Sequence, residues 1–102
     1  PDVNVVDLQT AWSELLRRAK LTARHTISRE ELSVREHMSS ILRRLQSAKF
    51  VEFQELFDPS RGVPVVVVNF IALLELSKEA LIEITQAEAF APIYVRLSYS
   101  PN

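Results

Sequence analysis

The sequence predicts a mainly α-helical chain with a small β-hairpin, which is an α+β class. Three observations lead to this prediction: a long apolar run, several shorter stretches with helical spacing of apolar residues, and two alternating stretches near the carboxyl end. Their order is helix, helix, turn, helix, hairpin, which is that of a winged helix-turn-helix. An additional amphipathic helix precedes this unit, and the hairpin would be its wing.

The longest apolar run, residues 62–84, is the stretch around which the other elements are organised. Residues 65–68 are four consecutive Val, which by propensity favour a strand. However, Pro64 suits the first turn of a helix, and the apolar pattern continues to Leu76, which is too long for a typical strand. We therefore predict a helix at about 63–79.

At 3.6 residues per turn, the residues of this long helix fall on two sides. The side expected to face the core gathers Val66, Val67, Phe70, Leu73, Leu74 and Ser77. The side expected to be exposed gathers Val65, Val68, Ala72, Glu75, Leu76 and Glu79. This second side is more apolar than a solvated face usually is and has no Arg or Lys, which favours a contact with another protein.

An amphipathic helix is predicted at 7–23, with Asp7 as its N-cap. Its apolar stripe consists of Leu8, Ala11, Trp12, Leu15, Leu16 and Ala19. The opposite face carries Arg17, Arg18 and Lys20, followed by Arg24 and His25, and we favour a solvated basic face over a nucleic-acid patch. The stripe is too apolar to be left in water, so it packs on its own domain, on a partner or on a second copy.

The remaining elements follow in order. Residues 24–27 are compatible with a strand, and Ser28 and Ser33 are two successive helix-start signals, the second of which opens a capping box with Glu36. The helix after it has its apolar stripe at Val34, Met38, Ile41, Leu42 and Leu45. A short helix at 50–57, a turn at 58–62 and two hairpin strands at 81–86 and 93–98 complete the unit. The predicted divisions are an amino-terminal helix (1–24), a winged-helix domain (25–98) and a polar tail (99–102).

Composition narrows the classes of function. The chain has 102 residues, a net charge of −1 and no Cys, so it provides no global attraction to nucleic acid or to an anionic membrane, and no thiolate chemistry. A single Gly excludes the glycine-rich phosphate loops of nucleotide-binding sites. His25 and His37 have no second ligand at metal spacing. We therefore expect no enzyme activity, no cofactor, no metal and no membrane span.

The predicted winged helix is poorly suited to reading DNA. A recognition helix presents Arg, Lys, Asn or Gln to base edges and phosphates. The long helix offers only Asn69 and Lys78, against the carboxylates of Glu75 and Glu79, and the wing offers Arg96 alone. A protein partner is therefore favoured over a nucleic acid.

Three stretches carry a resemblance to a known family: Ser33–Met38, Val51–Phe57 and Val67–Leu76. Together they resemble the carboxy-terminal winged-helix domain of segregation and condensation protein A, the bacterial kleisin, over about residues 5–97. The resemblance implies a non-catalytic subunit of the SMC condensin complex, acting in chromosome condensation and segregation in the cytoplasm, at the nucleoid. It implies two partners, the SMC ATPase head and segregation and condensation protein B, and residues 1–24 would be the end of the kleisin central region.

The expected interaction sites follow from the predicted faces and this resemblance. The SMC head is expected to contact Val68, Ala72, Glu75, Leu76, Ile93, Tyr94, Val95 and Arg96, partly through an open edge of the strand at 93–97. Leu8, Trp12, Leu15 and Leu16 are expected to bind a partner or a second copy, which would give a homodimer, if they do not pack in cis. No sequence-specific nucleic-acid contact and no membrane contact are expected. The alternative is a DNA-binding transcriptional regulator that uses Arg17, Arg18, Lys20, Arg24, Arg43 and Arg44 on phosphates.

Overall fold

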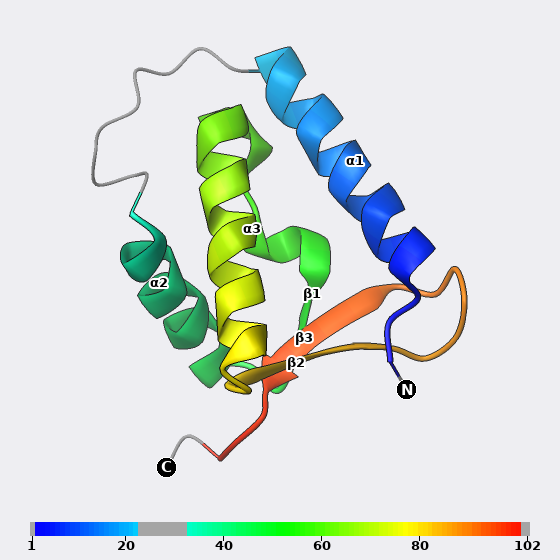
Figure 1. Cartoon of the computed structure of the whole chain (residues 1–102), viewed down its shortest axis with the longest axis vertical. Coiled ribbons are helices and arrows are strands. Elements are labelled where there is room, and N and C mark those ends of the chain that lie inside the picture. Colours follow the sequence, from blue (N-terminus) through cyan, green and yellow to red (C-terminus); the bar gives the residue numbers. More distant parts are fainter. Residues whose placement is uncertain (1, 23–32, 101–102) are drawn as a thin grey trace.

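The computed structural model describes residues 2–22 and 33–100, and it confirms the predicted class, mainly α with a small β-sheet (Figure 1). The elements are α1 (Val5–Thr22), α2 (Val34–Gln46), β1 (Val51–Glu52), the 3₁₀ turns η2 (Phe53–Leu56) and η3 (Pro59–Arg61), α3 (Val63–Lys78), β2 (Ile82–Gln86) and β3 (Ile93–Leu97). The strand predicted at 24–27 and the helix start predicted at Ser28 lie outside the described residues.

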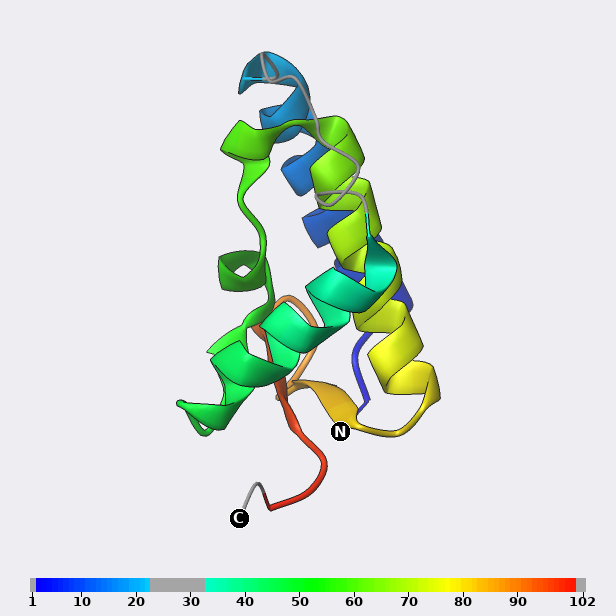
Figure 2. The same cartoon turned by 90° about the vertical axis from the view of Figure 1, so that its left-hand side faces the viewer.

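Helix α3 is the centre of the fold. In Figure 1 it stands between α1 and α2, and Figure 2 shows α2 crossing it obliquely. The predicted bounds are confirmed to within one residue. Gly62 precedes the helix at a φ of 96°, a left-handed conformation that Gly adopts without steric cost, and Pro64 lies in the first turn.

The buried side of α3 differs from the predicted one. Its buried residues are Val65, Val66, Asn69, Ala72, Leu73 and Leu76. The prediction that Val65, Ala72 and Leu76 would be exposed was therefore wrong, and Leu74, predicted to be in the core, is 44% exposed. The reason is that almost every position of this helix is apolar, so periodicity could not choose between faces that α1 and α2 cover from two sides.

The sheet has the strand order β1-β3-β2 and is antiparallel throughout. β3 is therefore the central strand: Tyr94 and Val95 pair with β1 on one side and with β2 on the other. The predicted open edge of this strand was wrong at these positions. The stretch 50–57, predicted as a helix, instead forms β1 followed by η2, because β1 supplies the ladder hydrogen bonds that β3 needs on that side.

Helix α1 packs on the rest of its own chain. It begins at Val5 because Asn4 caps it: the Asn4 side-chain oxygen accepts from the backbone N–H groups of Val6 and Asp7. The predicted N-cap, Asp7, was wrong. Leu15 and Ala19 are fully buried within the same cluster as the buried residues of α2, α3 and the sheet. The cis-packed alternative therefore describes this structure.

Helix α2 begins as predicted. The Ser33 hydroxyl oxygen accepts a hydrogen bond from the backbone N–H of Glu36 at 3.2 Å, and the helix starts at the next residue after the cap. Ile41 and Leu45 are buried against α3, which confirms the core face of the predicted stripe.

Candidate interaction surfaces

The structure separates the residues predicted to contact the SMC head into two groups. Ala72, Leu76, Ile93 and Val95 belong to the hydrophobic core. All four side chains are buried, so the predicted exposure of Ala72 and Leu76 was wrong. The side chains of Val68, Glu75 and Tyr94 are half-buried, and that of Arg96 is exposed.

The accessible apolar side of α3, here called the α3 face, is not the side that was predicted to be exposed. Ile71 and Leu74 are 45% and 44% exposed, and both are large aliphatic side chains. Pro64, Val67, Val68, Ile71, Leu74 and Glu75 share the i, i+3, i+4 spacing that places residues on one side of a helix. Sequence reasoning missed Ile71 and Leu74, because only the packing of α1 and α2 decides which apolar residues stay outside.

The wing residues have polar or aromatic partners within the sheet. The Arg96 guanidinium pairs with the carboxylate of Glu83 across the β2–β3 ladder at 2.7 Å. The Tyr94 ring packs edge-on against Phe50, with ring centroids 5.1 Å apart. The positive charge of Arg96 is therefore paired with the negative charge of Glu83 at the surface of the sheet.

The residues predicted to bind a partner or a second copy lie against α3 and its neighbours. Trp12 stacks on Phe70 with ring centroids 4.2 Å apart and an interplanar angle of 18°, and its ring is tilted by 57° to that of Phe57, with centroids 6.2 Å apart. Leu15 is fully buried, while Leu8 and Leu16 are half-buried and packed against the core. The apolar stripe of α1 therefore packs against the core of its own chain.

The basic face of α1 is partly neutralised by its own helix. The Arg17 guanidinium contacts the Glu14 carboxylate at 2.6 Å, and this pair lowers the pKa of Glu14 and raises the pKa of Arg17. Arg18 lies 3.9 Å from the same carboxylate and donates to the side-chain oxygen of Gln54 at 3.2 Å. A carboxylate among these cations weakens the case for a phosphate-binding patch.

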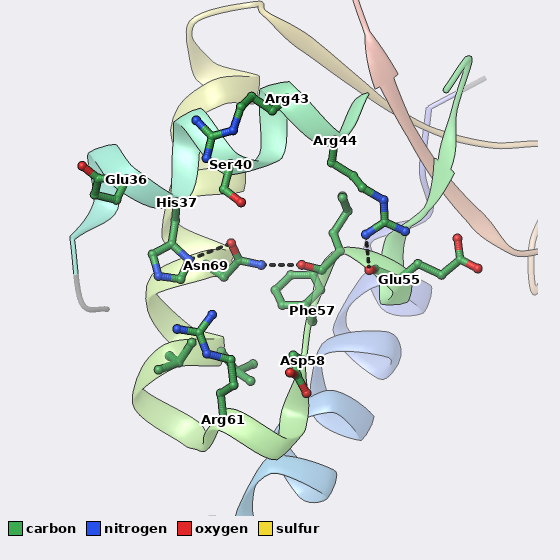
Figure 3. A pocket seen from close by; sticks show the side chains of 13 residues that line it. Glu36, His37, Ser40, Arg43, Arg44, Glu55, Phe57, Asp58, Arg61 and Asn69 are labelled. Atoms are coloured by element: carbon green, nitrogen blue, oxygen red, sulfur yellow. Dashed lines mark hydrogen bonds between the residues drawn. The ribbon is translucent and has the colours of Figure 1, made fainter. Parts of the chain in front are cut away.

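A polar cleft of about 550 Å³ opens between α2, the 3₁₀ turns and α3 (Figure 3). Its lining includes two linked hydrogen bonds: His37 Nδ1 lies 3.0 Å from Asn69 Oδ1 in a buried contact, and Asn69 Nδ2 donates to the part-buried Leu56 carbonyl at 2.7 Å. Arg44 donates to the Glu55 carbonyl at 3.2 Å. The lining also brings three arginines together with three carboxylates, so its formal charges balance.

Among residues 2–22 and 33–100 the structure has no group of three His, Asp or Glu side chains placed to hold a metal ion. Over the same ranges, none of the helices combines the length and apolar character that crossing a bilayer requires.

Comparison with known proteins identifies the family. The family model for segregation and condensation protein ScpA matches residues 2–98. Segregation and condensation protein A of Xylella fastidiosa is 44% identical over 96 residues, 94% of this chain and 32% of that protein. The Coxiella burnetii protein of the same name is 43% identical, covering 94% of this chain and 36% of its own length, and that of Listeria monocytogenes is 42% identical, covering 93% and 39%. The chain thus spans about a third of the length of these relatives, and it belongs to the segregation and condensation protein ScpA family.

Proposed function

We propose that the chain acts in chromosome segregation and condensation as a non-catalytic part of the bacterial SMC condensin complex, and that it binds the SMC ATPase head. Family membership supports the process, since the relatives are named for segregation and condensation. We further propose that it acts in the cytoplasm, at the nucleoid, beside segregation and condensation protein B. Residues 1–24 are proposed as the end of the central region and 25–98 as the head-binding domain.

The α3 face is the observation that carries the proposed head contact. It exposes Ile71 and Leu74 on a helix whose other sides are covered by α1 and α2. An exposed apolar helix side on a rigid support is typical of protein–protein contacts, whose centres are poor in charged residues. Glu75 beside it would repel DNA phosphates, so this face favours a protein and gives no basis for sequence-specific DNA contact.

We test this contact with Ile71→Arg and Leu74→Arg. Each change places a charge on the α3 face without touching the core, so we expect a loss of about 2 kcal/mol in binding to a purified SMC ATPase head, roughly a 30-fold rise in Kd. Isothermal titration calorimetry measures the affinity, and circular dichroism should show an unchanged fold.

The matched control is Leu21→Arg. Leu21 is 69% exposed on α1, and an Arg in the last turn of a helix is compatible with the helix dipole. It should bind the head like the unmodified chain. Undiminished binding of both α3-face variants would remove this face from the contact, and failure of the unmodified chain to bind at all would reject the proposed function.

A further inference from the structure

Phe90 is the most exposed large apolar side chain among those of the described residues, at 91%. It lies in the β2–β3 connection, here called the wing tip (residues 87–92), and its φ is 68°. A bulky residue other than Gly is rarely found at positive φ, because its Cβ crowds the backbone there. Such a conformation persists only where the surroundings enforce it, and it is found preferentially at functional sites.

The enforcing contacts come from the first turn of α1. Asp7 Oδ2 accepts a hydrogen bond from the Phe90 backbone N–H at 2.6 Å and another from Gln86 Nε2 at 2.9 Å. Gln86 Nε2 also donates to the Ala91 carbonyl at 2.8 Å, and Gln86 Oε1 accepts from the Asn4 backbone N–H at 2.9 Å. Figure 1 shows the wing tip beside the start of α1.

This network fixes the backbone on both sides of Phe90 while leaving its ring in water. Gln86 is only 2% exposed and its three hydrogen bonds are part-buried, whereas the hydrogen bond from Phe90 to Asp7 is exposed. Because the backbone that carries the Phe90 ring is held in place, little backbone freedom is lost when the ring enters a partner, which is a property of an interface anchor. The geometry points to Phe90 as the aromatic anchor of the wing in the contact with the SMC ATPase head, an inference that rests on the proposed function.

The surroundings of Phe90 define the chemistry of the surface that it fits. Phe90 is itself one of the residues that line a groove of about 240 Å³, whose apolar lining also includes Ala11, Phe53 and Pro92. Asp7 and Glu52 are the charged residues of this lining, which contains no Lys or Arg among the described residues. We therefore infer that the head offers an apolar pocket for the Phe90 ring, rimmed by Lys or Arg side chains that face these two carboxylates.

The test compares Phe90→Ala with Leu21→Ala, an equally simple truncation of an exposed apolar residue at the other end of α1. Binding of the whole chain to a purified SMC ATPase head is measured by isothermal titration calorimetry at two salt concentrations. We expect Phe90→Ala to raise Kd about 30-fold and Leu21→Ala to leave it unchanged. Glu52→Gln should raise Kd less and make the affinity less sensitive to salt.

A second variant separates the anchor from its support. Asp7→Ala removes the acceptor that holds the wing tip but keeps the Phe90 ring, so it should weaken head binding by several-fold, less than Phe90→Ala does. Equal binding by Phe90→Ala and the unmodified chain would overturn the inference while leaving the proposed function intact. The inference would also be overturned if Phe90→Ala weakened only self-association or only the binding of protein B. If the unmodified chain does not bind the head, the proposed function fails instead.

Discussion

At the scale of single residues, Asn69 shows how one polar group joins three parts of the fold. Its amide nitrogen donates to the Leu56 carbonyl, so its oxygen faces His37, and His37 Nδ1 is the donor in the bond between them. Asn69 belongs to α3, His37 to α2 and Leu56 to η2. The sequence placed Asn69 on the long helix as a possible DNA-reading residue. Only the folded structure shows that it is buried, because its partners come from 13 and 32 residues away.

We expect Asn69→Ala to reduce the free energy of unfolding by about 2 kcal/mol, since it removes the amide that pairs with the part-buried Leu56 carbonyl and with the buried His37 ring. Urea unfolding measures the change. Ser77→Ala, an exposed truncation on the same helix, should stay within about 0.5 kcal/mol of the unmodified chain. If Asn69→Ala changed the free energy of unfolding as little as this control, the hydrogen bonds of Asn69 would contribute little to stability.

At the scale of elements, the end of α3 stores local strain. Ala80 has a φ of 62°, the left-handed conformation in which helices commonly end on Gly. Two hydrogen bonds hold it there: the Leu81 N–H donates to the Leu76 carbonyl and the Ala80 N–H donates to the Ser77 carbonyl, each at 3.0 Å. This pair closes the last turn of the helix and turns the chain into β2.

Ala80→Gly should therefore stabilise the chain by roughly 1 kcal/mol, because Gly removes the Cβ clash at positive φ and this gain exceeds the entropy that Gly adds to the unfolded chain. Thermal unfolding by calorimetry measures the shift. Ala89→Gly is the matched control: Ala89 is not at positive φ, so Gly there should be neutral or destabilising. Stabilisation by both variants, or by neither, would contradict the strain argument.

The element scale also shows what sequence could and could not provide. The long helix, the capping box at Ser33 and both hairpin strands have local signals, and they were predicted within one or two residues. Strand β1 has no such signal, because two residues are too few for a period and its identity comes from pairing with β3. The exposed side of α3 was also predicted wrongly. Both sides of this helix are apolar, and the packing of α1 and α2 decides which of them is buried.

At the scale of the whole molecule, α1 shares one hydrophobic core with the helices and sheet that follow it. The sequence left cis packing and self-association open, since an amphipathic stripe does not specify what covers it. Trp12, stacked on Phe70, and Leu15, fully buried, show what covers it here. The predicted boundary near residue 24 therefore divides segments whose side chains are interleaved.

Leu15→Ala should lower the free energy of unfolding by about 3 kcal/mol through the lost burial and the cavity that it leaves, and should lower Tm by about 15 °C. Val6→Ala, exposed on the same helix, is the control and should change little. Analytical ultracentrifugation should give the monomer mass for both variants. A smaller assembly mass for Leu15→Ala with an unchanged Tm would mean instead that α1 packs between copies.

The hydrogen bond from Phe90 to Asp7 also has a consequence for chain topology, because it closes a loop of 83 residues. The entropy of closing a flexible loop grows only with the logarithm of its length, by about 0.6 kcal/mol for each doubling. Adding residues between α1 and α2 would thus barely weaken the tie between the helix and the wing. We therefore expect residues inserted there to leave the tie intact, provided that the Asp7 carboxylate still reaches the wing tip.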